Sequence, residues 1–176
     1  MGISMDDGFR ALADCLAGSE ETDLGQLLRA GAKAFNEAAP SSLETILSFG
    51  LMGMARSLRG TQEADLVAVA AALCAGGEAI MARAESKPGD KTILDALVPG
   101  VEVLVDGAPA ARDDREARWE LLARAAAAAA QGSESTREME AVHGRAAYSA
   151  ARSIGVLEGG SVVGRLIFEG IARRTE

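Results

Sequence analysis

The chain is organised around the stretch Ala84-Glu85-Ser86-Lys87-Pro88-Gly89-Asp90-Lys91-Thr92-Ile93-Leu94-Asp95-Ala96-Leu97, which separates two helical patterns. Pro88 disfavours helix at the residue before it, and Gly89 permits a positive φ. Asp90 can accept hydrogen bonds from freed backbone amides, and Thr92 with Asp95 forms a variant of the helix capping box. A helix start of this kind also suits an anion such as phosphate. Local physics alone predicts a turn followed by a well-capped helix.

The composition bounds the class of protein. A length of 176 residues fits one domain, covering residues 1–176, with a core of its own. A net charge of −8 argues against general nucleic-acid binding, which needs clustered cations, but it allows a local anion site. The apolar run from Leu66 to Ala75 is interrupted by Gly76-Gly77-Glu78, so we expect no membrane span. With no recognisable secretory signal, the sequence predicts a cytoplasmic protein.

Apolar residues recur with helical spacing along nearly the whole chain. We therefore expect an all-α fold, an up-and-down antiparallel helical barrel or bundle of seven to eight helices. Thr61 is expected to cap the fourth helix, and Pro99 to kink the fifth, although residues 101–105 could instead form a short strand. The expected helices cover residues 4–17, 22–38, 41–58, 61–85, the end of the Pro-Gly turn to 105, 113–130, 134–142 and 161–173.

The sequence offers little sign of a hydrolase or of a metal centre. His143 has no serine or cysteine in a nucleophile setting, and a lone histidine before glycine is typical of a helix C-terminus. Cys15 and Cys74 lack metal-ligand spacing. Asp6 and Asp7 are read as acids that compensate a helix dipole. No catalytic residue and no metal ligand is predicted.

The polar groups that do stand out fall at helix ends or in glycine-containing loops. They are residues 2–4, Ser41-Ser42, the turn 88–92, Arg145 and residues 158–161. If the helices alternate in direction, such loops meet at one end of the bundle. Amides, hydroxyls and a guanidinium gathered there would suit a phosphate or nucleotide. Taken singly, each feature is explained as well by plain helix capping.

Two motifs in order resemble one family. Residues 87–97 are similar to the P-G-D-K-T-M-x-D-A-L signature of the nucleotide-binding L subunit, or Dak2-type domain, of dihydroxyacetone kinase. Gly144-Arg145-Ala146-Ala147-Tyr148 with Arg152-Ser153-Ile154-Gly155 resembles the family's G-R-A-S-Y-L-G-E-R-S-x-G, and Thr136-Arg137-Glu138-Met139 stands where the family has T-x-x-M. The resemblance covers nearly the whole chain from Gly2 onward.

The resemblance implies an eight-helix barrel that holds ATP or ADP with Mg²⁺ at one rim. Phosphate would pass to dihydroxyacetone, or a related short ketose, held by a separate K-type kinase subunit. In one branch of the family, ADP stays bound and is rephosphorylated by a phosphotransferase-system protein; in the other, ATP is an ordinary substrate. The nucleotide-binding positions carried over from the family are Gly2, Ile3, Ser4, Ser41, Ser42, Ala84, Ile93, Arg145, Glu158, Gly159 and Gly160.

The sequence also departs from the family pattern. The family's first helix and metal-binding aspartates would precede Met1, so no metal ligand carries over. Ala39-Pro40 replaces a glycine pair, Leu43 a glycine, residues 149–151 replace L-G-E, and Glu158-Gly159 replaces D-P. Either Met1 is an internal methionine of a longer protein, which we favour, or the chain is a degenerate paralogue. Translation of the upstream genomic DNA in the same frame distinguishes the two, because only the first predicts a G-D-x-D motif just before Met1.

The leading hypothesis is therefore the nucleotide-binding subunit of a dihydroxyacetone-type kinase. The alternative is a non-catalytic paralogue that acts as a helical binding or regulatory protein; a ligand-free bundle and a lipid-like ligand in an apolar interior are further readings. No nucleic acid and no membrane are expected as partners. Loss of one helix from a closed barrel would expose an apolar strip, so a homodimer is also a possibility.

Overall fold

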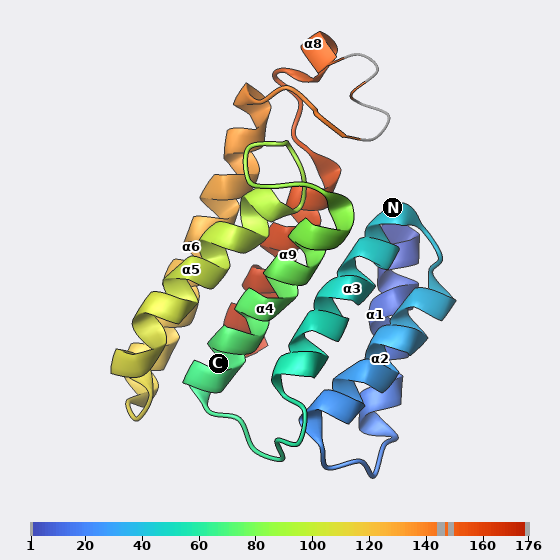
Figure 1. Cartoon of the computed structure of the whole chain (residues 1–176). Helices are drawn as coiled ribbons and strands as arrows, with labels where there is room; N and C mark the ends of the chain where they lie inside the picture. The colour runs from blue at the N-terminus through green and yellow to red at the C-terminus, as the bar shows by residue number, and fades with distance from the viewer. Residues whose placement is uncertain (1, 144–146, 148–149, 175–176) are drawn as a thin grey trace. The chain divides into compact units, whose positions relative to one another are not determined.

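The computed structural model describes residues 2–143, 147 and 150–174, and all the secondary structure in these residues is helical (Figure 1). The chain divides into two compact units, an N-terminal unit of residues 1–84 and a C-terminal unit of residues 85–176. Helices that follow one another along the chain pack together within each unit. The predicted all-α class is thus confirmed for the described residues.

The N-terminal unit contains four helices: α1 (Gly2–Ala17), α2 (Leu24–Ala38), α3 (Ser42–Ser57) and α4 (Leu66–Ala84). Phe35 is fully buried and meets Phe9 edge-on, with ring centroids 5.2 Å apart. Between α3 and α4 the backbones approach closely: a Cβ added to Gly53 would lie 2.6 Å from the carbonyl oxygen of Ala75. Small residues thus replace large aromatic ones as the means of packing these helices.

Helix α4 differs from its prediction at its start. It begins at Leu66, because the carboxylate of Asp65 accepts the Ala68 N–H at 2.8 Å, and Thr61 is not the cap. It also runs unbroken through Gly76 and Gly77. With a mean hydropathy of 1.6 over 18 residues, α4 could cross a membrane by length and composition alone, but core helices of soluble proteins pass the same test.

The C-terminal unit contains α5 (Leu94–Ala111), α6 (Arg115–Ser135), the 3-10 helix η1 (Thr136–Glu138), the short α8 (Ala150–Ser153) and α9 (Gly159–Arg174). Helices α5, α6 and α9 pack against one another. The backbone of α6 comes so near to α5 that a Cβ on Gly132 would lie 2.0 Å from the carbonyl oxygen of Asp95. That contact brings α6 against the first turn of α5, directly after the Pro-Gly turn.

The fifth helix, predicted to reach residue 105 with Pro99 inside it, is confirmed as α5. It is longer than predicted, because it continues to Ala111 with Pro109 also inside it, so the alternative of a strand over residues 101–105 is wrong. The helix predicted over 134–142 is wrong beyond residue 138. Residues 134 and 135 end α6, η1 covers 136–138, and Met139 is extended, with φ −95° and ψ 149°. In this region the Arg137 carbonyl accepts the Gly155 N–H, and the Met139 carbonyl accepts from the Lys91 ammonium.

Candidate functional site

The turn between α4 and α5 has the geometry that its sequence predicts. Gly89 adopts φ +96°, and the carboxylate of Asp90 accepts the Lys87 N–H at 3.0 Å. The Asp90 N–H in turn donates to the Lys87 carbonyl at 3.2 Å. Asp90 is buried. The buried carboxylate of Asp90 therefore stabilises the Pro-Gly turn through its bond to the Lys87 N–H.

Asp95 holds the other half of the turn. Its two carboxylate oxygens accept the N–H groups of Gly89 and Thr92, each at 2.6 Å, and only 4% of the residue is exposed. The Thr92 hydroxyl accepts the Leu94 N–H at 3.2 Å. The predicted capping arrangement of Thr92 and Asp95 is confirmed, and the Gly89 contact extends it across the turn.

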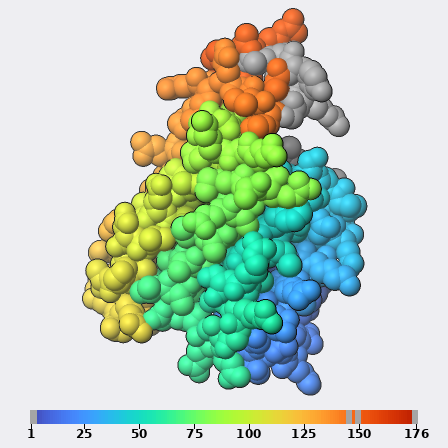
Figure 2. All heavy atoms as spheres, viewed as in Figure 1, coloured from blue at the N-terminus to red at the C-terminus, as the bar shows by residue number. Residues whose placement is uncertain are grey.

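Lys91 has a role that the sequence did not reveal. Its backbone adopts φ +60°, and its side chain points into the protein, where Nζ donates to the carbonyl oxygens of Met139, Ser153 and Val156 at 3.1, 2.5 and 2.8 Å. In Figures 1 and 2 the light-green turn accordingly lies against the orange segment that follows α6. Lys91 thus joins the turn to a segment some fifty residues later.

His143 also contacts the turn, and the prediction that it ends a helix is wrong. It lies outside any helix, with Nε2 3.3 Å from the carboxylate of Asp90, while the neighbouring Val142 N–H donates to the Asp90 carbonyl at 3.3 Å. The backbone N–H of Lys87, together with His143, holds the pKa of Asp90 below its ordinary value of 3.8, although burial opposes this shift. The folded turn therefore favours the ionised carboxylate.

This shift predicts how stability depends on pH. Because the pKa of Asp90 is lower in the folded than in the unfolded chain, its contribution is present above pH 3.8 and is lost as the pH falls through the folded-state pKa. In urea unfolding, the difference in free energy of unfolding between wild type and Asp90→Asn should shrink as the pH drops from 6 to below 4. Asp106→Asn, at an exposed position of α5, is the control. A difference that stays constant over this range would contradict the assignment.

A second polar cluster lies in the N-terminal unit, around the start of α3. Glu44 is fully buried, and its carboxylate accepts hydrogen bonds from the hydroxyls of Ser4, at 2.6 Å, and of Ser41. Ser41 is the N-cap residue of α3, but its side chain makes no capping bond to the helix amides. The first-turn N–H groups of α3 are therefore left without a side-chain acceptor from their own cap.

The start of α9 has the opposite arrangement. The carboxylate of Glu158 accepts the N–H groups of Gly160 and Ser161 at 2.8 and 2.5 Å. The Glu158 N–H donates to the hydroxyl of Thr136 at 3.1 Å, and the hydroxyls of Ser161 and Ser133 are hydrogen-bonded to each other at 3.0 Å. The glycine-containing segment 158–161 is thus a capped helix start, with two of its amides already bonded.

The predicted nucleotide-binding residues fall in both units. Gly2 and Ile3 begin α1, Ser4 and Ser41 bond to Glu44, Ser42 begins α3, and Ala84 ends α4. In the C-terminal unit, Ile93 is 3% exposed beside the turn, and Glu158, Gly159 and Gly160 form the start of α9. Arg145 lies outside the described residues. The common rim that would unite these residues remains a prediction.

Glu44, like Lys91, was not among the residues predicted from the sequence. The spacing Ser41-x-x-Glu44 matches a capping box, which could have drawn attention to it. In the structure, however, the serine hydroxyl donates to the glutamate and does not accept from the backbone. The usual capping-box interpretation would therefore have misassigned its role.

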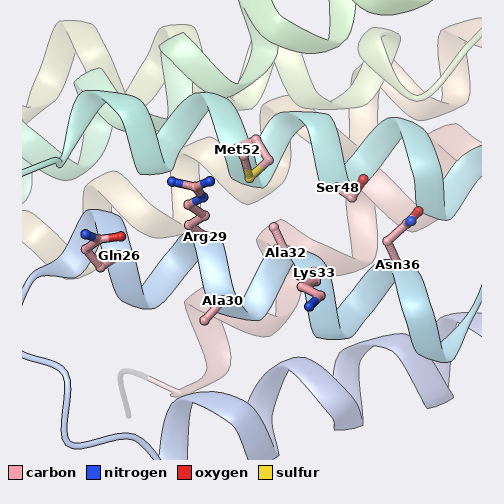
Figure 3. Close-up of a pocket in the computed structure, with 8 residues that line it drawn as sticks. All are labelled: Gln26, Arg29, Ala30, Ala32, Lys33, Asn36, Ser48 and Met52. Carbon is pink, nitrogen blue, oxygen red and sulfur yellow. The ribbon is translucent and has the colours of Figure 1, made fainter.

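A surface pocket of about 470 Å³ lies between α2 and α3 (Figure 3). None of the predicted nucleotide-binding residues that the structure describes lines it. Lys33 lines the pocket from α2. Its Nζ lies 3.8 Å from Oε1 of Glu37, which compensates part of the positive charge of the lysine. The lining residues are Gln26, Arg29, Ala30, Ala32, Lys33, Asn36, Ser48 and Met52.

The chain belongs to the DAK2 domain family, whose model matches residues 1–173. The resemblance read from the two motifs is thereby confirmed.

Among characterised relatives, the chain is 28% identical over 173 residues to the L-erythrulose kinase of Pectobacterium atrosepticum, covering 97% of this chain but only 29% of that enzyme. It is 26% identical over 157 residues to the ADP-binding subunit DhaL of the PEP-dependent dihydroxyacetone kinase of Escherichia coli, covering 88% of this chain and 71% of that subunit. The chain thus corresponds to most of a separate subunit and to under a third of the longer kinase.

The fold is also that of a solved protein. The dihydroxyacetone kinase of C. freundii, in its native form, matches 98% of this chain with a TM-score of 0.70 at 20% identity, and the chain spans 28% of that protein. The same kinase has been solved in complex with AMP-PNP and Mg²⁺, with a TM-score of 0.69 to this chain. At this identity the likeness establishes the fold.

Proposed function

We propose that this chain is the ATP- or ADP-binding subunit of a dihydroxyacetone-type kinase. In this proposal it supplies phosphate to dihydroxyacetone, or a related short ketose, held by a partner K-type subunit. Membership of the DAK2 domain family supports the proposal, as do relatives named as ketose kinases and as ADP-binding subunits. The alignment covers most of the DhaL subunit, which is consistent with a chain that works beside a separate partner subunit.

The observation that carries the proposal is the start of α3. Ser41 directs its hydroxyl to Glu44, so the first-turn amides of α3 have no acceptor from their cap. Amides at a helix N-terminus carry a partial positive charge and bind phosphate groups well. Ser41 and Ser42 are exposed and are among the positions that the resemblance to the family implies for nucleotide binding. These residues would bind and orient phosphate oxygens by backbone N–H groups.

The described residues do not fit a magnesium site of their own. Among them, no three His, Cys, Asp or Glu side chains lie close enough together to hold a metal ion. In phosphoryl transfer, Mg²⁺ would neutralise charge on the phosphate oxygens. No role for these side chains is therefore assigned through the metal, and we expect these 176 residues alone to bind Mg·ADP more weakly than micromolar. Micromolar binding by calorimetry would contradict that expectation.

The α3 assignment can be tested with a single backbone N–H. The variant Ser42→Pro removes the backbone amide hydrogen at the first helical position. This position tolerates proline because the preceding residue, Ser41, already has the extended backbone that proline requires, with φ −129° and ψ 171°. Ser42→Ala is the matched control, because it removes the hydroxyl but keeps the N–H. In NMR titrations with millimolar ADP, we expect Ser42→Pro to bind roughly tenfold more weakly than Ser42→Ala.

Two results would count against this function. If the amide signals of α3 in the wild-type chain do not shift at any ADP concentration, the start of α3 is not a phosphate site. If the two variants bind ADP with equal affinity, the Ser42 N–H is not a ligand. The phosphate donor is tested separately, by comparing ATP with a phosphotransferase-system donor in assays that contain a K-type subunit and dihydroxyacetone. Transfer from only one of them assigns the chain to that branch.

A further inference from the structure

The ammonium group of Lys91 is fully engaged within the protein. Only 6% of the residue is exposed, and Nζ lies within hydrogen-bond distance of three backbone carbonyl oxygens. An ammonium has three N–H donors, so all three are used. A buried charge is costly unless it is hydrogen-bonded in this way. A lysine in a glycine-containing turn at a helix start is often a phosphate ligand, but here no donor is left for a ligand.

The three acceptors come from separate places along the chain. Met139 follows η1, Ser153 ends α8, and Val156 lies two residues before Glu158 at the start of α9. One side chain therefore ties the Pro-Gly turn to the segment that leaves η1 and to the segment that enters α9.

Further hydrogen bonds connect these two segments to each other. The Gly155 N–H donates to the Arg137 carbonyl at 2.7 Å, and the Ala141 N–H donates to the Ser153 hydroxyl at 2.9 Å. The Glu158 N–H reaches the Thr136 hydroxyl at 3.1 Å. The path of the chain into the capped start of α9 thus depends on hydrogen bonds between the same two segments that the Lys91 ammonium binds.

We propose that Lys91 is a positioning residue for nucleotide binding. It does not contact the nucleotide; its ammonium fixes Ser153 and Val156, and through them the position of Glu158 and the first turn of α9, relative to the Pro-Gly turn. This proposal rests on the proposed function for its ligand, but the arrangement of the two segments can be measured without any ligand.

The first experiment measures amide hydrogen exchange in the full chain, in wild type, Lys91→Met and Lys91→Arg. Lys33→Met, at an exposed position of α2, is the control. In Lys91→Met we expect the amides of Ala141, Val142 and Gly155 to exchange roughly tenfold faster or more, while α5 and α6 keep their protection. Lys91→Arg, which keeps a cation, should restore part of the protection. Unchanged exchange at these amides in Lys91→Met would overturn the proposal.

The second experiment measures ADP affinity at a temperature where circular dichroism shows each variant to be folded. We expect roughly tenfold weaker binding in Lys91→Met, partial recovery in Lys91→Arg, and no change in Lys33→Met. Lys91→Met with faster exchange but wild-type affinity would show that Lys91 only stabilises the fold, and would overturn the positioning role. If wild type itself binds no ADP, the proposed function fails, whereas the exchange data still decide whether Lys91 fixes the two segments.

A third measurement needs no variant and covers the case in which Lys91→Met does not fold. The chain has three lysines, of which Lys33 and Lys87 are exposed and Lys91 is buried. Acetic anhydride should label Lys33 and Lys87 of the folded chain first, and Lys91 only on unfolding. Labelling of Lys91 at the rate of the other two, with the helices intact, would overturn the proposal, whereas protection of Lys91 in the folded chain would support the engagement of its ammonium by the two segments.

Discussion

Replacement of Gly132 by alanine should lower the free energy of unfolding of the C-terminal unit by about 3 kcal/mol. A Cβ at this position would lie 2.0 Å from the carbonyl oxygen of Asp95 and 3.1 Å from its carbonyl carbon. Both are backbone atoms in the first turn of α5, so no side chain can move aside. Alanine would force α6 away from α5 and from the turn that Asp95 holds. Urea unfolding followed by circular dichroism measures the loss.

Gly170 provides the matched control for this substitution. It also lies inside a helix of the same unit, α9, but a Cβ there would meet no atom within 4 Å. Gly170→Ala should therefore raise the free energy of unfolding by about 0.5–1 kcal/mol, because alanine favours the helix. A Gly132→Ala protein as stable as wild type would show that the two helices do not approach as closely as described.

Substitution of Asp95 by asparagine is expected to cost about 3 kcal/mol. Both carboxylate oxygens accept backbone N–H groups, those of Gly89 and Thr92, and the residue is 4% exposed. Asparagine offers one acceptor oxygen, and its NH₂ group would face the second N–H donor. One buried amide of the turn would then lose its partner, without any large change in side-chain volume.

Asp106→Asn is the control for the Asp95 variant. Asp106 lies on the exposed face of the same helix, so its replacement should change the free energy of unfolding by less than about 0.5 kcal/mol. Urea unfolding at pH 7 compares the two variants. Equal stability of Asp95→Asn and Asp106→Asn would mean that the turn does not depend on the Asp95 carboxylate.

The turn itself could be predicted from the sequence because its determinants are local. The positive φ of Gly89, the Lys87 N–H bonded to Asp90, and the pairing of Thr92 with Asp95 all join residues at most three apart, or depend on a single residue. Propensities and capping rules describe such contacts well. The helical class was predictable for the same reason.

The roles of Lys91 and Glu44 could not be predicted in this way. Lys91 bonds to carbonyls 48 to 65 residues away, and Glu44 accepts from Ser4 on another helix. Periodicity identifies a buried face but not the partner of a buried charge. A charged residue in a turn or at a helix start is normally solvated, so neither residue is expected from its sequence position to be buried.

The prediction of a helix over 134–142 failed because of competing hydrogen bonds. Thr136 donates its hydroxyl to the Ser133 carbonyl at 2.7 Å and accepts the Glu158 N–H, and the Met139 carbonyl bonds to Lys91. In the structure the Met139 carbonyl accepts from the Lys91 ammonium, and the backbone at Met139 is extended. Helix propensity alone does not account for such partners. The meeting of the predicted nucleotide-binding residues at one rim depends on similarly distant contacts, and it stays a prediction.

Position 91 must meet two requirements that pull towards different amino acids. A left-handed backbone with φ +60° favours glycine or asparagine. Glycine has no side chain, and the asparagine side chain is too short to reach the carbonyls of Met139, Ser153 and Val156. A long cation can reach them, yet it strains the backbone at its own Cα. The turn therefore has local backbone strain at Lys91 together with a long-range contact that only a long cation can make. Redesign of this loop by backbone preference alone would select glycine or asparagine at position 91 and would remove the hydrogen bonds that join the turn to the segments before and after α8.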